Sequence, residues 1–183
     1  LAKHLEHANL SVAMLDAVFV THEHSDHVGC CFEIGRKWGV PVWTSRGTYE
    51  GAGSPEMKGS LRIIRDGDSF EWGSMTVTPF TVPHDAREPL QLSITQNTLK
   101  VSLLTDLGHV TNHVLTSVQG SHSILLESNH DPAMLNNSKY PPFLRRRIAG
   151  SHGHLPNDVA GQVLAEINHD GLKNVVAAHL SRQ

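Results

Sequence analysis

Four short apolar runs in this chain each end at a histidine or an aspartate, and no other feature restricts the fold as strongly. The runs are AVFVT, TVTPFTVP, VSLLT and NVVAA, and the residues that follow them are His22, His84, Asp106 and His179. Runs rich in valine, phenylalanine and threonine are typical of buried strands. Because an α/β sheet presents functional groups where its strands pass into loops, the pattern predicts polar chemistry at one edge of a sheet. Taken singly, each residue is explained as well by a helix cap or by a buried histidine with a partner.

The order of elements predicts a mixed α/β fold. A strand, a loop, a helix over Asp26–Trp38 and a strand over Pro41–Thr44 form a βαβ unit near the start. Short strand-like runs separated by turn residues predict an antiparallel meander from Leu61 to Thr105. Helices and strands then alternate, and we expect them at Thr111–Val118, Ser123–Glu127, Phe143–Ile148, after Pro156 and at Asn174–Ala178.

The size and composition exclude several classes of protein. With 183 residues, the chain is expected to form one domain over residues 1–183. No run approaches 18 apolar residues and no signal peptide is visible, so we expect no membrane span. The adjacent Cys30 and Cys31 form neither a disulfide framework nor a CxxC metal pair, which favours core packing in a reduced, cytoplasmic setting. The net charge of −3 offers no overall basic surface for nucleic acid.

The segment Thr21–His27 carries the most specific pattern, HxHxDH. His22 and His24 are two residues apart, so an extended or turning backbone can aim both imidazoles at one point. Asp26 and His27 begin the next helix, from which their side chains reach a second point. Four ligand-type side chains within six residues fit one tetrahedral ion poorly, so two neighbouring ions are the simpler interpretation. The alternative is a polar loop in which Asp26 caps the helix.

The motifs THEHSDH, PHDA, TDLG and AHLS resemble the metallo-β-lactamase superfamily of metal-dependent hydrolases over almost the whole chain. The stretches ESNHD and GHLPN add a likeness to its WalJ/YycJ-type branch, which is associated with 5′→3′ exodeoxyribonuclease activity. The resemblance implies a four-layer αβ/βα sandwich, in which two mixed β-sheets lie between outer helices. It also implies seven ligands for two divalent ions: His22, His24 and His84 for the first, Asp26, His27 and His179 for the second, and Asp106 as the bridge.

The expected chemistry is hydrolysis of phosphodiester bonds by a metal-bridging hydroxide, because two divalent ions activate water and neutralise charge on a phosphoryl oxygen. Nitrogen and oxygen ligands suit zinc or manganese, and the sequence does not separate these metals. Asp26 is also expected to accept a hydrogen bond from the nucleophilic water. His154 is the first candidate for the acid that protonates the leaving group, and His130 is the second. Asn129, His130 and His154 are candidates for contact with the substrate.

Several of these polar residues have a second interpretation. His154 is otherwise an ordinary loop histidine, and His130 is otherwise the neighbour of a helix N-terminus. The three consecutive arginines Arg145–Arg147 are expected either to bind DNA phosphates or to form the solvated end of a helix. Glu127 and Asp85 are candidates for holding a metal-bound histidine in one tautomer.

The leading hypothesis is a binuclear phosphodiesterase that acts on DNA in the cytoplasm, without a membrane or an obligate protein partner. The alternatives are a cyclic or other phosphodiesterase, a hydrolase of a carboxylic ester, thioester or lactam on the same scaffold, and a metal-binding relative without turnover. Members of the family continue beyond both ends of this sequence. We therefore expect that the N- and C-terminal flanks are missing and that the chain is a fragment.

Overall fold

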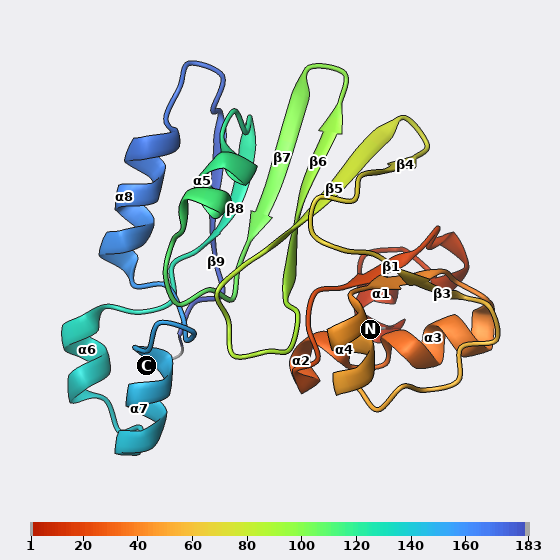
Figure 1. The fold of residues 1–183 in the computed structure, drawn as a ribbon, viewed down its shortest axis with the longest axis horizontal. Helices are drawn as coiled ribbons and strands as arrows, with labels where there is room; N and C mark the ends of the chain where they lie inside the picture. Colours follow the sequence, from red (N-terminus) through yellow and green to blue (C-terminus); the bar gives the residue numbers. More distant parts are fainter. Residues whose placement is uncertain (1, 182–183) are drawn as a thin grey trace. The chain divides into compact units, whose positions relative to one another are not determined.

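The computed structural model describes residues 2–181 and contains two compact units, each built around one β-sheet (Figure 1). The first unit holds the chain up to Arg65 together with Ala86–Leu90. The second unit holds Asp66–Asp85 and the chain from Gln91 onward. The predicted α/β class with two sheets and helices is confirmed. The single domain over the whole chain stays a prediction.

The first unit has a three-stranded parallel sheet in the order β1-β2-β3. Val20, Phe32, Val42 and Met57 form its core, because α3 buries one apolar face. Of the two cysteines predicted to pack in the core, Cys31 packs against it and Cys30 is the N-cap residue of α3. Burial raises the pKa of the Cys31 thiol. The elements are α1 (Ala2–His7), η1 (Val12–Met14), β1 (Val18–Val20), α2 (Ser25–Val28), α3 (Cys31–Trp38), β2 (Val42–Thr44), α4 (Arg46–Gly51) and β3 (Leu61–Ile63).

Two predictions about the first unit are wrong. The helix expected over Asp26–Trp38 is divided into α2 and α3, because Gly29 adopts a φ of 42° between them. A positive φ ends a right-handed helix, and glycine adopts it without a steric penalty. The strand β3 does not join the antiparallel meander but pairs in parallel with β2, with Leu61 opposite Val42. The segment through α4 supplies the crossover that a parallel pair needs.

The second unit has a mixed sheet in the order β4-β5-β6-β7-β8-β9. The pairs β4–β5 and β6–β7 are antiparallel, which confirms that part of the predicted meander. The strands β7, β8 and β9 run parallel to one another. The six strands are β4 (Phe70–Trp72), β5 (Met75–Thr81), β6 (Leu90–Gln96), β7 (Leu99–Leu104), β8 (Ser123–Glu127) and β9 (Asn174–Ala178).

Helices α5 and α8 pack beside this sheet and close its core (Figure 1). The buried residues Leu104, Val114, Leu126 and Val163 bring β7, α5, β8 and α8 together. The four helices of this unit are α5 (Asn112–Val118), α6 (Pro132–Asn137), α7 (Pro142–Ile148) and α8 (Asn157–Ile167). Three of them match predicted helices, and α6 begins just after His130, where one of two interpretations of that residue placed a helix N-terminus. Within residues 2–181, no helix is both long enough and apolar enough to cross a membrane.

Gly153 lies where two parts of the second unit pass very close to each other. A Cβ atom added there would lie 2.2 Å from the carbonyl oxygens of Arg147 and Ile148. We expect Gly153→Ala to lower the free energy of unfolding by about 3 kcal/mol or more, since backbone atoms yield less than a flexible side chain does. Denaturant titration of the full-length protein measures this loss.

Gly161→Ala is the matched control. A Cβ atom at Gly161, within α8, meets no atom within 4 Å. Alanine is also a better helix former than glycine by about 1 kcal/mol, so this variant is expected to be neutral or more stable. Equal unfolding midpoints for the two variants would contradict the close approach at Gly153.

Candidate metal centre

The HxHxDH segment forms the loop between β1 and α2 in the first unit. The backbone leaves β1 at Val20, and the carbonyl oxygen of Thr21 accepts a hydrogen bond of 2.9 Å from the amide of Leu90. His22 is fully buried, and His24 is the N-cap residue of α2 in an extended conformation. The loop is therefore anchored on both sides, which restricts the directions in which its imidazoles can point.

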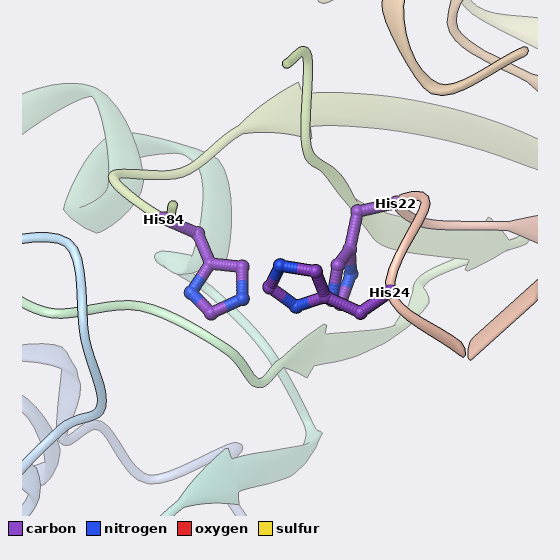
Figure 2. Close-up of side chains that lie close together, drawn as sticks. All are labelled: His22, His24 and His84. Atoms are coloured by element: carbon purple, nitrogen blue, oxygen red, sulfur yellow. The ribbon is translucent and has the colours of Figure 1, made fainter. Parts of the chain in front are cut away.

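Three imidazole rings of this loop lie against one another. The rings of His22 and His24 meet edge to face, with centroids 4.6 Å apart (Figure 2), and the rings of His22 and His27 lie 4.0 Å apart. The hydroxyl oxygen of Thr21 lies 3.1 Å from Nδ1 of His22 and 3.2 Å from Nδ1 of His27. A single hydroxyl group thus lies beside the Nδ1 atom of both rings.

The ring nitrogens of this loop fit the requirements of a metal ion. Nε2 of His22 lies 3.0 Å from Nδ1 of His24. Two nitrogens that share a tetrahedral zinc ion lie about 3.3 Å apart, given Zn–N bonds of about 2.0–2.1 Å. The carboxylate of Asp26 is exposed and lies 3.7 Å from Nε2 of His27. The loop therefore brings together the four ligand-type side chains that the sequence analysis singled out here.

In the second unit, three polar side chains lie at the ends of three neighbouring parallel strands. Asp106 follows β7, Glu127 is the last residue of β8 and His179 directly follows β9. The register places Glu127 opposite Ala178, so the three strands end at similar heights. Because carboxyl ends of parallel strands meet at one edge of a sheet, these side chains come together. Asp106 and His179 both have positive φ values, of 55° and 53°, which are uncommon for residues other than glycine.

Glu127 is the centre of this arrangement. Its Oε1 accepts hydrogen bonds from Nδ1 of His179 at 2.7 Å and from Nδ1 of His154 at 2.9 Å. Its Oε2 accepts from the backbone amides of Leu107 at 3.0 Å and Leu155 at 3.2 Å. The carboxylate is fully buried and has a partner on each oxygen, as a buried charge requires.

The hydrogen bonds to Glu127 keep it ionised. Burial by itself raises the pKa of this carboxyl group, but the hydrogen bonds from His154, His179 and Leu107 outweigh burial and lower the pKa to about 2. With Nδ1 of His179 donating to Glu127, Nε2 becomes the nitrogen that can bind a metal ion. Nε2 lies 3.4 Å from Oδ1 of Asp106, so a predicted ligand and the predicted bridge are neighbours. A carboxylate behind a histidine is the arrangement that orients metal-bound imidazoles.

His84, one of the side chains drawn in Figure 2, follows β5 and is buried. Its Nδ1 lies 3.2 Å from the carbonyl oxygen of Gly153. A carbonyl oxygen only accepts, so Nδ1 donates and Nε2 remains the potential ligand atom. Burial lowers the pKa of His84, which favours the neutral ring that metals bind. Asp85 was a candidate for holding this histidine in one tautomer, but Nδ1 is held by Gly153 instead, while Oδ1 of Asp85 lies 3.5 Å from Nε2. Asp85 also forms an ion pair with Arg147.

The three candidates for substrate contact lie beside this cluster in the second unit. His154 shares Glu127 with His179, and the two rings are 4.9 Å apart. The side-chain amide of Asn129 donates to the carbonyl oxygen of His179 at 2.7 Å. Nδ1 of His130 lies 3.2 Å from Oδ1 of Asn129, and burial lowers the pKa of this histidine. His130 also precedes the N-cap residue of α6, as its second interpretation stated.

The donor atoms of the second unit also fit a metal ion. Asp106, Glu127, His154 and His179 each offer one nitrogen or oxygen atom, and these atoms all lie within 4.8 Å of one another. Glu127 holds two histidines, although its sequence pattern predicted only one such partner. It ends a buried strand as the predicted ligands do, but a strand-end position does not reveal that two histidines share it. A single binuclear site with ligands from both units stays a prediction.

A model of the Beta-lactamase superfamily domain matches residues 2–179 of this chain. The chain therefore belongs to the beta-lactamase superfamily. The resemblance stated from the motifs is confirmed, and with it the class of metal-dependent hydrolases.

Two curated relatives that this chain resembles are both named exodeoxyribonucleases. The chain is 33% identical to Exodeoxyribonuclease YycJ of Bacillus anthracis over 179 residues, which cover 95% of this chain and 67% of the relative. It is 28% identical to Exodeoxyribonuclease WalJ of Streptococcus pneumoniae serotype 2, with 92% of this chain and 65% of the relative covered. The chain thus spans about two thirds of the length of these relatives.

A solved structure supports the fold. The metallo-beta-lactamase fold protein YhfI of Bacillus subtilis matches with a TM-score of 0.70 at 16% sequence identity, covering 94% of this chain and 68% of YhfI. At this identity the likeness concerns the fold alone.

Replacement of Glu127 by glutamine tests its central position. Glu127→Gln removes the charge and places an amide donor against N–H groups that already donate, so we expect the free energy of unfolding at pH 7 to fall by about 3 kcal/mol. The folded-state pKa lies below the ordinary value of 4.5, so the stabilisation is complete above pH 4.5 and is lost as the pH falls towards 2. The difference between wild type and variant should therefore shrink over that range. Denaturant titrations with a chelator present measure it without a contribution from metal binding.

Glu166→Gln serves as the control, because Glu166 is exposed on α8. We expect this change to stay within about 0.5 kcal/mol. A difference between wild type and Glu127→Gln that stays constant from pH 7 to about pH 2 would contradict the low pKa of Glu127.

Proposed function

We propose that this chain carries the metal centre of a binuclear, metal-dependent phosphodiesterase that removes nucleotides from DNA, as a 5′→3′ exodeoxyribonuclease does. Membership of the superfamily supports a hydrolase, and the names of the two curated relatives support DNA as the substrate. The cytoplasmic setting that a DNA substrate suggests stays a prediction.

One observation carries the proposal more than any other. Glu127 holds the Nδ1 atoms of His154 and His179 on one oxygen, beside the carboxylate of Asp106. A fully buried carboxylate that orients two histidines is costly to maintain for stability alone, since a buried ionic group stabilises a fold only weakly. A role in orienting metal ligands before the metal binds explains why the carboxylate is buried there.

The proposed ligands divide into two groups. His22, His24 and His84 would hold one divalent ion, Asp26, His27 and His179 would hold the other, and Asp106 would serve both; zinc and manganese both suit such nitrogen and oxygen donors. When bound, two ions supply an activated water for attack and neutralise the charge of a phosphodiester. His84 and His179 each donate through Nδ1 to an oxygen of the chain, which aims Nε2 at the ion.

The remaining residues have roles in handling protons and substrate. Asp26, with its exposed carboxylate, accepts a hydrogen bond from the attacking water. His154 donates through Nδ1 to Glu127, so Nε2 is the atom through which it delivers a proton to the leaving oxygen. Asn129 and His130 lie next to His179 and contact the nucleotide that is released.

Metal analysis tests the binuclear centre. We expect the full-length protein, saturated with zinc or manganese and then desalted, to retain two ions per chain by plasma mass spectrometry. Asp106→Ala is expected to retain at most one, because the bridging carboxylate contributes to both positions. One ion or none in the wild-type protein would refute the binuclear centre.

A hydrolysis assay tests the reaction and its substrate class. We expect metal-loaded protein to release the label of 5′-labelled DNA as a mononucleotide, and Asp26→Asn to reduce kcat by about 100-fold or more. Asp170→Asn, which changes an exposed aspartate in a turn of the second unit, should leave kcat unchanged. The nuclease proposal fails if metal-loaded protein leaves both DNA and bis(p-nitrophenyl) phosphate intact. Hydrolysis of a carboxylic ester, thioester or lactam in their place would favour the alternatives on this scaffold.

A further inference from the structure

A pocket with a volume of about 490 Å³ lies between α6 and α7 in the second unit, and we call it the α6–α7 pocket. Its volume is within the range of about 300–1,000 Å³ that is usual for ligand sites. Helix α6 contributes Pro132, Leu135 and Asn136, helix α7 contributes Pro142, Arg145 and Arg146, and His130, Ala149 and Pro156 complete the lining.

The spacing of residues along α7 explains why some of its side chains line the pocket and others point away from it. Pro142, Arg145, Arg146 and Ala149 lie at positions i, i+3, i+4 and i+7, which is one face of a helix, and this face lines the pocket. Arg147 lies outside this face, and its guanidinium group forms two hydrogen bonds with Asp85, of 2.5 and 3.2 Å. The three consecutive arginines therefore differ in their surroundings: two face the α6–α7 pocket and the third is paired with a carboxylate.

The pocket offers positive charge beside an apolar wall. None of the residues that line it is a carboxylate, while Arg145 and Arg146 both do so. Arg145 is half-buried and donates through Nη1 to the carbonyl oxygen of Asn136, so it also ties α7 to α6. Arg146 is exposed and can reach a ligand. Prolines, a leucine and an alanine supply apolar surface, so a ligand with an anionic group beside an apolar or aromatic body fits this lining.

An exposed aromatic side chain lies on the same helix as the arginines of the pocket. Phe143 is 66% exposed, although it is a large apolar residue. On the surface of α7 it lies one turn before Arg146, at i and i+3. Exposed aromatic rings next to arginines are typical of surfaces that bind single-stranded nucleic acid, because bases stack on the rings and phosphates pair with the guanidinium groups.

The pocket is also connected to the candidate metal centre within the second unit. His130, in the lining, lies 3.2 Å from the side chain of Asn129, which donates to the carbonyl oxygen of His179. One residue, Asn129, thus separates the wall of the pocket from a proposed metal ligand.

We infer that the α6–α7 pocket binds one nucleotide of a single-stranded DNA end, with Arg146 on its phosphate and Phe143 against a neighbouring base. This inference rests on the proposed function and adds the residues that would select a polynucleotide over a small phosphodiester. Arg145 is a positioning residue, because it holds the two helices that form the pocket.

Binding of an uncleavable oligonucleotide tests the inference. We would measure fluorescence anisotropy of a 3′-labelled phosphorothioate oligothymidylate with the metal-loaded, full-length protein, at several salt concentrations. Arg146→Ala should weaken binding and reduce the slope of log K against log salt by about 0.7, the value for one lost phosphate contact on a single strand. Phe143→Ala should raise Kd by about tenfold, and Phe143→Tyr, which keeps a ring, should restore most of the affinity.

Arg62→Ala is the matched control, since it removes one exposed positive charge from β3 in the first unit. It should leave both Kd and the salt slope near the wild-type values. Equal Kd values and salt slopes for Arg146→Ala, Phe143→Ala and Arg62→Ala would overturn the inference. Cleavage of DNA with no contribution of Arg146 or Phe143 to binding would refute the pocket and leave the proposed function intact. Binding that depends on these residues, without any cleavage, would refute the proposed function and leave the pocket intact.

Discussion

The second unit depends on the ionised carboxylate of Glu127 more than on any other polar group. It lies fully buried at the end of β8 and accepts hydrogen bonds from two imidazoles and two backbone amides. The backbone amides belong to Leu107 and Leu155, so one side chain fixes the loop after β7, the loop before α8 and the residue after β9. An unpaired charge at this depth would cost several kcal/mol, which makes these partners mutually dependent. These hydrogen bonds therefore hold the side chains around Glu127 in fixed directions at this edge of the sheet.

The parallel part of the second sheet explains why such a cluster forms there. Strands β7, β8 and β9 all point the same way, and each delivers one polar side chain at its carboxyl end. Asp106 and His179 adopt left-handed backbone conformations directly after these ends. Conformations of this kind cost about 1–3 kcal/mol each and persist where the surrounding contacts require them, which is common at functional sites. The backbone strain at Asp106 and His179 is therefore of the kind found at functional sites, where surrounding contacts maintain it.

Helix α7 shows how one short element can serve two purposes. Its face with Pro142, Arg145 and Arg146 lines a positively charged pocket, while Arg147 is committed to Asp85 next to a proposed metal ligand. The overall charge of −3 conceals this local concentration of arginine. A weakly acidic protein can thus present a surface suited to a polyanion, because nucleic acid responds to local charge within about 10 Å rather than to the sum over the chain.

The sequence alone determined which polar residues follow the strands, the family to which the chain belongs and the α/β class. It could do so because strand-forming runs and the HxHxDH motif are local patterns. The expectation that all these strands are buried is wrong for β9, in which Val175 and Val176 are exposed. The sequence did not determine that Gly29 divides the predicted helix in two or that β3 pairs in parallel with β2, and it left a helix after His130 as one of two interpretations. Nor did it reveal that Glu127 joins His154 to His179, or which arginines of α7 face a pocket. These features depend on contacts between residues far apart in the chain and on the direction in which side chains point. Only the packed structure decides these features. Strand pairing brings distant residues together, and burial then requires a carboxylate such as Glu127 to find hydrogen-bond partners among them.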